Sequence, residues 1–153
     1  MIVRIYGTAL KMTQVKGFEI TGIEAQRFSK TGERLVNIRI EQNSSVTRIT
    51  KSEEGTASVE FRFTTNYAGI GFIKLEGQII LQGEVERIIE EWNKKGSMPD
   101  DIANIVHNVV VSNCVPTALL ISRDLRLPPP IPLPKINIQK RATRGPGDSV
   151  EVA

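Results

Sequence analysis

The chain has 153 residues, the length of one ordinary domain with a single hydrophobic core. Its 40% hydrophobic and 24% charged residues are typical of a globular protein and exclude wholesale disorder. The single cysteine, Cys114, excludes an internal disulfide and a thiolate zinc cluster. Because neither a signal stretch nor an apolar run of membrane length is recognised, we expect a cytoplasmic protein without membrane insertion. The net charge of +3 weakly favours an anionic partner such as RNA.

Strand-like patterns fill the first part of the chain. Apolar residues alternate with polar ones in the segments 3–12, 18–23, 36–41, 59–64 and 73–81. Gly77, inside the last segment, leaves room for a bulge or a close neighbour. Turn residues at 52–55 and 66–69 separate successive segments. Since short turns favour antiparallel pairing, the pattern predicts a meander of about four antiparallel strands.

Two helices are expected next. The first has an apolar stripe, acidic residues in its first turn and basic residues in its last, and is closed by Gly96; the stripe is Val85, Ile88, Ile89 and Trp92. The second begins at Pro99, with an apolar stripe of Ile102, Ile105, Val106, Val109 and Val110. Pro116 is expected to kink or interrupt this helix, which continues to about Leu125.

A proline-rich segment follows at residues 127–134, with the sequence LPPPIPLP. Proline cannot continue a helix or a central strand, so the segment is expected to be extended polyproline II. It could dock in an aromatic groove of a partner. The interleaved Leu127, Ile131 and Leu133 favour packing on this chain or a sister subunit, because exposing three aliphatic side chains is costly. Residues 139–153 are expected to form a flexible basic tail.

The residues that could support catalysis are few. His107 is the only histidine and lies off the apolar stripe of its helix, so it is expected at solvent or at the edge of a contact. Cys114 is expected to be a buried structural thiol. The glycines match neither a phosphate-binding loop nor a dinucleotide fingerprint. The sequence therefore predicts a binding protein and not an enzyme, with no metal and no cofactor.

The order of elements resembles that of the SecB export-chaperone superfamily, especially the archaeal-type SecB-like proteins. The matching parts are the opening VRIY at residues 3–6, the strand segments, and the C-terminal sequence. In that sequence a proline-containing helix at 115–123 leads into LRLPP at 125–129, with Ile131 following. The resemblance implies an α+β domain over residues 1–138. Its expected form is a four-stranded antiparallel β-meander with two C-terminal helices packed on one face, then an extended proline-rich segment.

The same resemblance implies a homodimer or homotetramer that holds unfolded chains in apolar grooves without nucleotide. Carried over to this sequence, the candidate residues for client or partner binding are Phe72, Ile80, Leu127, Pro129, Ile131 and Leu133. Two features depart from SecB proteins, which are acidic and carry a second C-terminal helix after the proline connection. This chain is basic, and residues 135–138 are expected to be extended. These departures put docking to SecA in doubt.

Two functions follow from these expectations. The first is an ATP-independent, SecB-like chaperone that holds nonpolar segments of unfolded polypeptides. The alternative is a ribosome-associated factor, in translation or in ribosome hibernation and dimerisation, built on a homodimeric scaffold. In that case the candidate contacts to rRNA are Lys135, Lys140, Arg141 and Arg144. A subunit of a fixed assembly, docked through the proline-rich segment, is a third interpretation.

Overall fold

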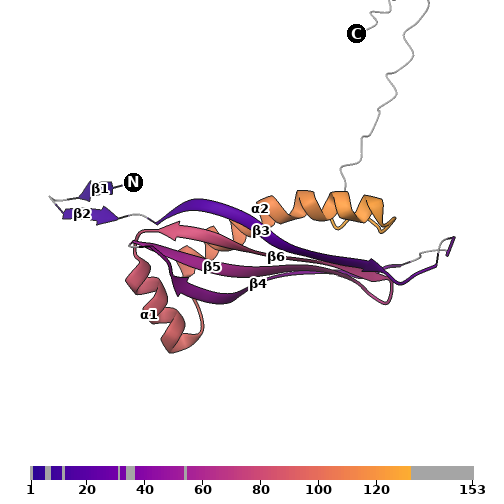
Figure 1. Cartoon of the computed structure of the whole chain (residues 1–153), viewed down its shortest axis with the longest axis horizontal. Helices are drawn as coiled ribbons and strands as arrows, with labels where there is room; N and C mark the ends of the chain where they lie inside the picture. Colours follow the sequence, from indigo (N-terminus) through magenta and orange to yellow (C-terminus); the bar gives the residue numbers. More distant parts are fainter. Residues whose placement is uncertain are drawn as a thin grey trace, which may run out of the picture.

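A computed structural model describes residues 2–5, 8–11, 13–30, 32–33, 37–53 and 55–131 (Figure 1). The strands are β1 (Ile2–Ile5), β2 (Thr8–Lys11), β3 (Gln14–Arg27), β4 (Ile40–Lys51), β5 (Thr56–Tyr67) and β6 (Gly71–Gln82). The helices are α1 (Val85–Lys95) and α2 (Asp100–Asp124). The strands β1 and β2 form a small hairpin beyond one end of the main sheet (Figure 1). The predicted α+β class, with four antiparallel strands followed by two helices, is confirmed.

The main sheet has the strand order β3-β6-β5-β4, with every neighbouring pair antiparallel. The strands β4, β5 and β6 are joined by tight turns and follow the meander that the sequence predicts. Only β3 departs from it, because β3 pairs with β6 and not with β4. This is a Greek-key order, in which a long connection carries the chain across to the far side of a three-stranded meander. As a result β3 and β4 are the two edges of the sheet.

The strand predicted at residues 36–41 begins later and runs much further than expected. In the structure Ile38 and Arg39 precede the strand, and β4 extends from Ile40 to Lys51. The additional residues are almost all polar, with Val46 and Ile49 as the only large apolar side chains after Ile40. An edge strand tolerates this composition because it has only one strand neighbour and much of it faces solvent.

The hydrophobic core lies between the sheet and the helices. Along β5 and β6 every second residue is buried, as strands with one covered face require. The largest fully buried side chains are those of Tyr67, Phe61, Phe63, Ile73, Leu75, Ile79, Leu81, Ile88 and Ile102. The helix α1 contacts β4 and β5, and α2 contacts β4, β5 and β6. Figure 1 shows α1 at one end of the sheet and α2 running from there toward the opposite end.

The helix α1 forms as its sequence predicts. Its C-terminal cap is Gly96 in a left-handed conformation (φ 68°), whose N–H donates to the Trp92 carbonyl over 2.8 Å. Two i,i+4 ion pairs are also present, with 2.8 Å between Lys94 and Glu90 and 3.5 Å between Lys95 and Glu91.

The helix α2 is continuous over 25 residues, so the expectation that Pro116 interrupts it is wrong. Pro116 is on the exposed side of the helix, and its ring removes one backbone hydrogen bond. Ending the helix there would cost more free energy, because residues after Pro116 pack on the sheet. The buried residues recur every fourth position: Ile102, Val106, Val110, Cys114, Ala118 and Ser122. By length and composition α2 could also cross a membrane, which corrects the expectation that no apolar run is long enough. Here one side of it covers the sheet.

Candidate polypeptide-binding groove

The proline-rich segment packs on its own chain. After α2 the backbone turns back, and the Leu127 N–H donates to the Ser122 carbonyl over 2.8 Å. The Leu127 side chain is only 5% exposed and belongs to the core. Two carbonyls of the segment then accept hydrogen bonds from the sheet, at Pro128 and Pro130. Of the two interpretations of this segment, packing on the same chain is therefore confirmed as far as Ile131, where the described residues end.

Both of these hydrogen bonds come from side chains on the helix-facing side of the sheet. The Tyr67 hydroxyl donates to the Pro128 carbonyl over 2.7 Å, and the Gln42 amide donates to the Pro130 carbonyl over 2.6 Å. Burial raises the pKa of Tyr67 from 10.0 to about 12, an effect that a hydrogen bond with Ser122 partly opposes. The phenol therefore stays a neutral donor, and it holds the segment against β5.

A groove with mainly aliphatic and proline side chains in its walls lies between the start of β4 and the proline-rich segment. It has a volume of about 480 Å³. Its walls are formed by Ile38, Ile40, Gln42, Pro129, Pro130 and Ile131. The isoleucines are partly exposed, and the Gln42 amide donates to the Pro130 carbonyl. The groove therefore offers aliphatic and proline side chains together with backbone polar atoms, and a nonpolar side chain could contact the former.

The other face of the sheet is polar, which separates two of the predicted binding residues from the rest. Phe72 and Ile80 do point away from the helices, as predicted. They are about 26 Å apart along β6, at the roughly 3.3 Å per residue of a strand. Between them lie ion pairs and polar contacts, including Arg62 to Glu76 at 3.0 Å and Lys74 to Glu24 at 2.7 Å. Phe72 and Ile80 therefore do not form one groove.

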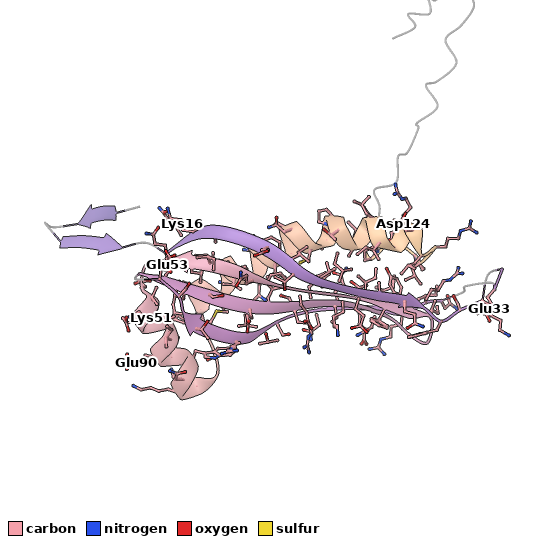
Figure 2. The ribbon with its side chains drawn as sticks, in the orientation of Figure 1. Lys16, Glu33, Lys51, Glu53, Glu90 and Asp124 are labelled. Atoms are coloured by element: carbon pink, nitrogen blue, oxygen red, sulfur yellow. The ribbon has the colours of Figure 1, made fainter. Side chains whose placement is uncertain are left out.

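Each of these two residues has its own surroundings. The Phe72 ring packs against the ring of Phe28, with centroids 5.8 Å apart. Ile80 lines a second hollow, of about 460 Å³, whose other walls are mostly polar: Lys16, Ser52, Glu53, Thr56 and Gln82. Figure 2 shows Lys16 and Glu53 together at this end of the sheet. A hollow with a lysine and a carboxylate at its rim is less suited to nonpolar chains than the groove beside β4.

The two residues considered for catalysis, His107 and Cys114, both make contacts that stabilise the fold. His107 Nδ1 lies 2.9 Å from the hydroxyl of Ser44, so the imidazole links α2 to β4 at the edge of a contact, as predicted. Cys114 is fully buried, and burial raises the pKa of its thiol to about 11, as expected of a structural cysteine. Among the described residues, no three His, Cys, Asp or Glu side chains gather as a metal site would require.

The exposed side of α2 is a second unusual surface. From Ile102 to Ser122 the helix has no Asp, Glu, Lys or Arg. Val111 and Leu120 are 44% and 56% exposed there, and they are interspersed with polar but uncharged residues: Asn104, Asn108, Ser112 and Asn113. Depletion of charge in favour of apolar and neutral side chains is typical of the centre of a protein interface. We call this surface the neutral face of α2.

Comparison with known proteins gives a structural match but none by sequence. No protein-family model and no curated protein matches the sequence. Among solved structures, the chain is similar to the SecB-like chaperone Rv1957 of Mycobacterium tuberculosis, determined in complex with a ChAD peptide from the HigA1 antitoxin Rv1956. The match has a TM-score of 0.53 and covers 82% of this chain and 88% of the other. The chain has a SecB-like fold. At 9% identity the similarity establishes the SecB-like fold alone, and it gives no support to an archaeal type.

Within this SecB-like fold, the predicted binding residues are divided among several places. Pro129 and Ile131 line the groove beside β4, Leu127 is in the core, and Phe72 and Ile80 lie apart on the polar face. Leu133 and the four basic candidates, Lys135, Lys140, Arg141 and Arg144, lie outside the described residues. Sequence reasoning missed Ile38, Ile40, Gln42 and Pro130 as groove residues. The two isoleucines gave one signal, their alternation, which indicated a half-buried strand and not a binding surface.

Proposed function

We propose that this chain is an ATP-independent chaperone that holds nonpolar segments of unfolded polypeptides. The observation that carries the proposal is the groove beside β4, with its isoleucine and proline side chains, located in a fold whose matched structure contains a bound peptide. Burying about 200 Å² of apolar client surface would contribute about 5 kcal/mol at roughly 25 cal/mol per Å². Ordering the client offsets much of that gain, so binding is weak and reversible, as a holding function requires.

Suppression of aggregation tests the proposal. At near-stoichiometric ratio the protein should keep several unfolded model clients in solution without nucleotide. Replacing Ile131→Asp puts a charge in the groove and should reduce the suppression at least several-fold. The matched control is Ile23→Asp, since Ile23 is 58% exposed but lies on β3, at the opposite edge of the sheet. Equal activity of both variants would count against the groove, and no suppression by the wild-type protein would count against the function.

Self-association through the neutral face of α2 is part of the same proposal. A second copy fits this face because its charges are self-complementary about Ser112. Asp101 and Arg123 each lie 11 residues from Ser112, which is close to three helical turns, so all three residues follow one line along the helix. An antiparallel copy would place Asp101 opposite Arg123 twice, with the uncharged residues between. The exposed asparagines suit a protein partner better than lipid, where amides would lack hydrogen bonds.

Contact with rRNA through the basic tail remains the alternative function. Its four basic residues lie outside the described part of the chain, so it stands on the sequence alone. The salt dependence of binding distinguishes the two functions, because contacts to phosphates weaken steeply with ionic strength and apolar binding does not. Co-sedimentation with ribosomal particles at low salt that is lost at moderate salt would favour the rRNA function. The proposed location is the cytoplasm, whose reducing conditions suit a lone thiol; cell fractionation tests it.

A further inference from the structure

The two ends of the main sheet differ in the sign of their charge. At the end with α1, the segment from Glu84 to Asp101 has six acidic and three basic side chains. The opposite end comprises the β5–β6 turn, the parts of β3, β4 and β6 beside it, and the end of α2 (Figure 1). Its charged side chains in the described part of the chain are the basic Arg27, Lys30, Arg39, Lys74, Arg123 and Arg126 and the acidic Glu24, Glu33, Glu41 and Asp124. We call it the basic end.

The chain also leaves the described residues at the basic end. Ile131 lines the groove with Ile40, whose strand partner Tyr67 pairs in turn with Gly71 at the β5–β6 turn. The residues that follow, 132–153, have four basic and two acidic side chains: Lys135, Lys140, Arg141, Arg144, Asp148 and Glu151. The charge of the folded end and the charge of the tail therefore have the same sign.

Exposed carboxylates neutralise part of this charge, but only weakly. The ion pairs at the basic end are Lys74 with Glu24 at 2.7 Å, Arg39 with Glu41 at 2.7 Å and Arg123 with Asp124 at 3.2 Å. Their carboxylate side chains are all more than half exposed. Exposed ion pairs contribute little to stability, so an incoming phosphate can take the place of a carboxylate at small cost.

An aromatic pair lies at the same end, on the face of the sheet that the helices leave uncovered. Phe72 points away from the helices, and the ring of Phe28 lies beside it with centroids 5.8 Å apart. The Phe28 N–H donates to the Ile70 carbonyl, which holds the ring next to the β5–β6 turn. The Phe28 side chain is nevertheless 55% exposed. Core packing therefore does not account for a phenylalanine at this position.

The groups around the aromatic pair suit bases and phosphates. The pairing register places Gln26 on one side of Phe72 and Asn66 on the other, and both amides are exposed. Lys74 follows on the same face, and Lys30 is exposed just beyond the pair. Aromatic rings stack on unpaired bases, amides hydrogen-bond base edges, and amines neutralise phosphates. This combination is typical of surfaces that bind single-stranded nucleic acid.

We propose that the basic end binds single-stranded nucleic acid, with an unpaired base stacked on Phe28 and phosphates at Lys30 and Lys74. The site is on the opposite face of the sheet from the groove, so the inference goes beyond the proposed chaperone function and does not rest on it. A duplex binds less well, because its bases are already stacked and only its phosphates can contribute. An acidic polypeptide likewise uses the charges but not the ring.

Substitution of Phe28 in the full-length protein tests the stacking. The probes are a labelled oligoadenylate of about 12 nucleotides, as RNA and as DNA, and the duplex of each with its complement. Fluorescence anisotropy should show wild-type binding to a single strand in preference to its duplex, and the RNA and DNA arms show which of the two sources the site prefers. Phe28→Ala should weaken single-strand binding about tenfold, and Phe28→Trp should retain it.

The matched control for Phe28 is Ile23→Ala. Ile23 is 58% exposed on β3 but pairs with the buried Leu75, so it lies on the helix-facing side of the sheet. This variant should change the affinity less than about twofold, because no stacking ring is removed. No binding by the wild-type protein, or equal effects of the Phe28→Ala and Ile23→Ala variants, would overturn the inference.

The charge contribution is tested with Lys30→Gln and Lys94→Gln. Both variants lose one positive charge, but Lys94 is on α1, at the opposite end of the sheet, and its side chain is 70% exposed. Lys30→Gln should lower the slope of log affinity against log salt by about 0.7, the value for one phosphate of a single strand, and Lys94→Gln should leave the slope unchanged. Equal slopes would overturn the site, as would polyglutamate that competes as well as unlabelled oligoadenylate.

Aggregation assays separate this site from the groove. Phe28→Ala should suppress client aggregation as the wild type does, because the groove is on the other face of the sheet. If Phe28→Ala lowers the thermal stability, the two lysine variants still decide. Oligonucleotide binding without suppression would reject the chaperone function and leave this inference standing, and suppression without oligonucleotide binding would do the reverse.

Discussion

Gly77 is the residue at which the sheet leaves least room for a side chain. An added Cβ would collide with the Glu19 carbonyl oxygen and lie 2.8 Å from Cζ of Phe61, whose ring stacks on Phe18 at 5.2 Å. The sequence predicted a close neighbour at Gly77, and the structure has two: a backbone carbonyl of β3 and an aromatic ring of β5. Neither can move away cheaply, because both are held by the sheet.

Gly77→Ala should accordingly destabilise the fold by about 3 kcal/mol, as overpacking against fixed groups does. The measurement is the free energy of unfolding in urea. Gly22→Ala on β3 is the matched control, since its added Cβ would meet only the Cβ of Glu76 at 4.0 Å. That variant should unfold at nearly the wild-type urea concentration, and a similar loss in both variants would contradict the packing described at Gly77.

The raised pKa of Tyr67 leads to a prediction for the stability of the fold at alkaline pH. Burial raises its pKa to about 12, above the 10.0 of an exposed tyrosine. The folded chain thus keeps a proton that the unfolded chain loses, so the contribution of Tyr67 is complete below pH 10 and is lost between about pH 10 and 12. Over that window, stability should fall more steeply with pH in the tyrosine protein than in Tyr67→Phe, by about 1.4 kcal/mol per pH unit. Urea unfolding in a Cys114→Ala background measures this without the buried thiol, and parallel slopes would contradict it.

At the scale of the elements, signals within a segment's own sequence predicted the position of that segment well, and elements that depend on distant contacts were predicted poorly. The helix α1 could be placed because its stripe, end charges and closing Gly96 are all within its own sequence. Most of β4 could not be placed, because few of its residues are apolar. Two of its polar side chains face the helices, and their hydrogen-bond partners are far away in the sequence. Gln42 bonds to Pro130, 88 residues away, and Ser44 to His107, 63 residues away. Pro129 and Ile131 could be predicted as groove residues from the proline-rich segment alone. Pro130 and the residues of β4 could not, because their place in the groove depends on the distant contact between Gln42 and Pro130.

At the scale of the whole molecule, the neutral face of α2 predicts a symmetric dimer. Reversing one charge, in Asp101→Arg or in Arg123→Asp, would place like charges opposite each other twice and should shift the protein toward monomer. The double variant restores opposite charges and should associate nearly as the wild type does. Sedimentation equilibrium measures the mass of all four proteins. A wild type that is monomeric at micromolar concentration, or single reversals that leave the mass unchanged, would contradict this interface.

The place of β3 beside β6 also sets an order of events during synthesis. Gln14 pairs with Gln82 and Arg27 with Gly71, so the partners are 44 to 68 residues apart. At roughly 5 to 20 residues per second, the ribosome delivers β6 on the order of ten seconds after β3. The β4–β5 hairpin can close locally in that time, but β3 has no partner until β6 is made, and closing so long a loop is slow. A protein proposed to hold unfolded polypeptides thus has one of its own edge strands unpaired until β6 has been synthesised.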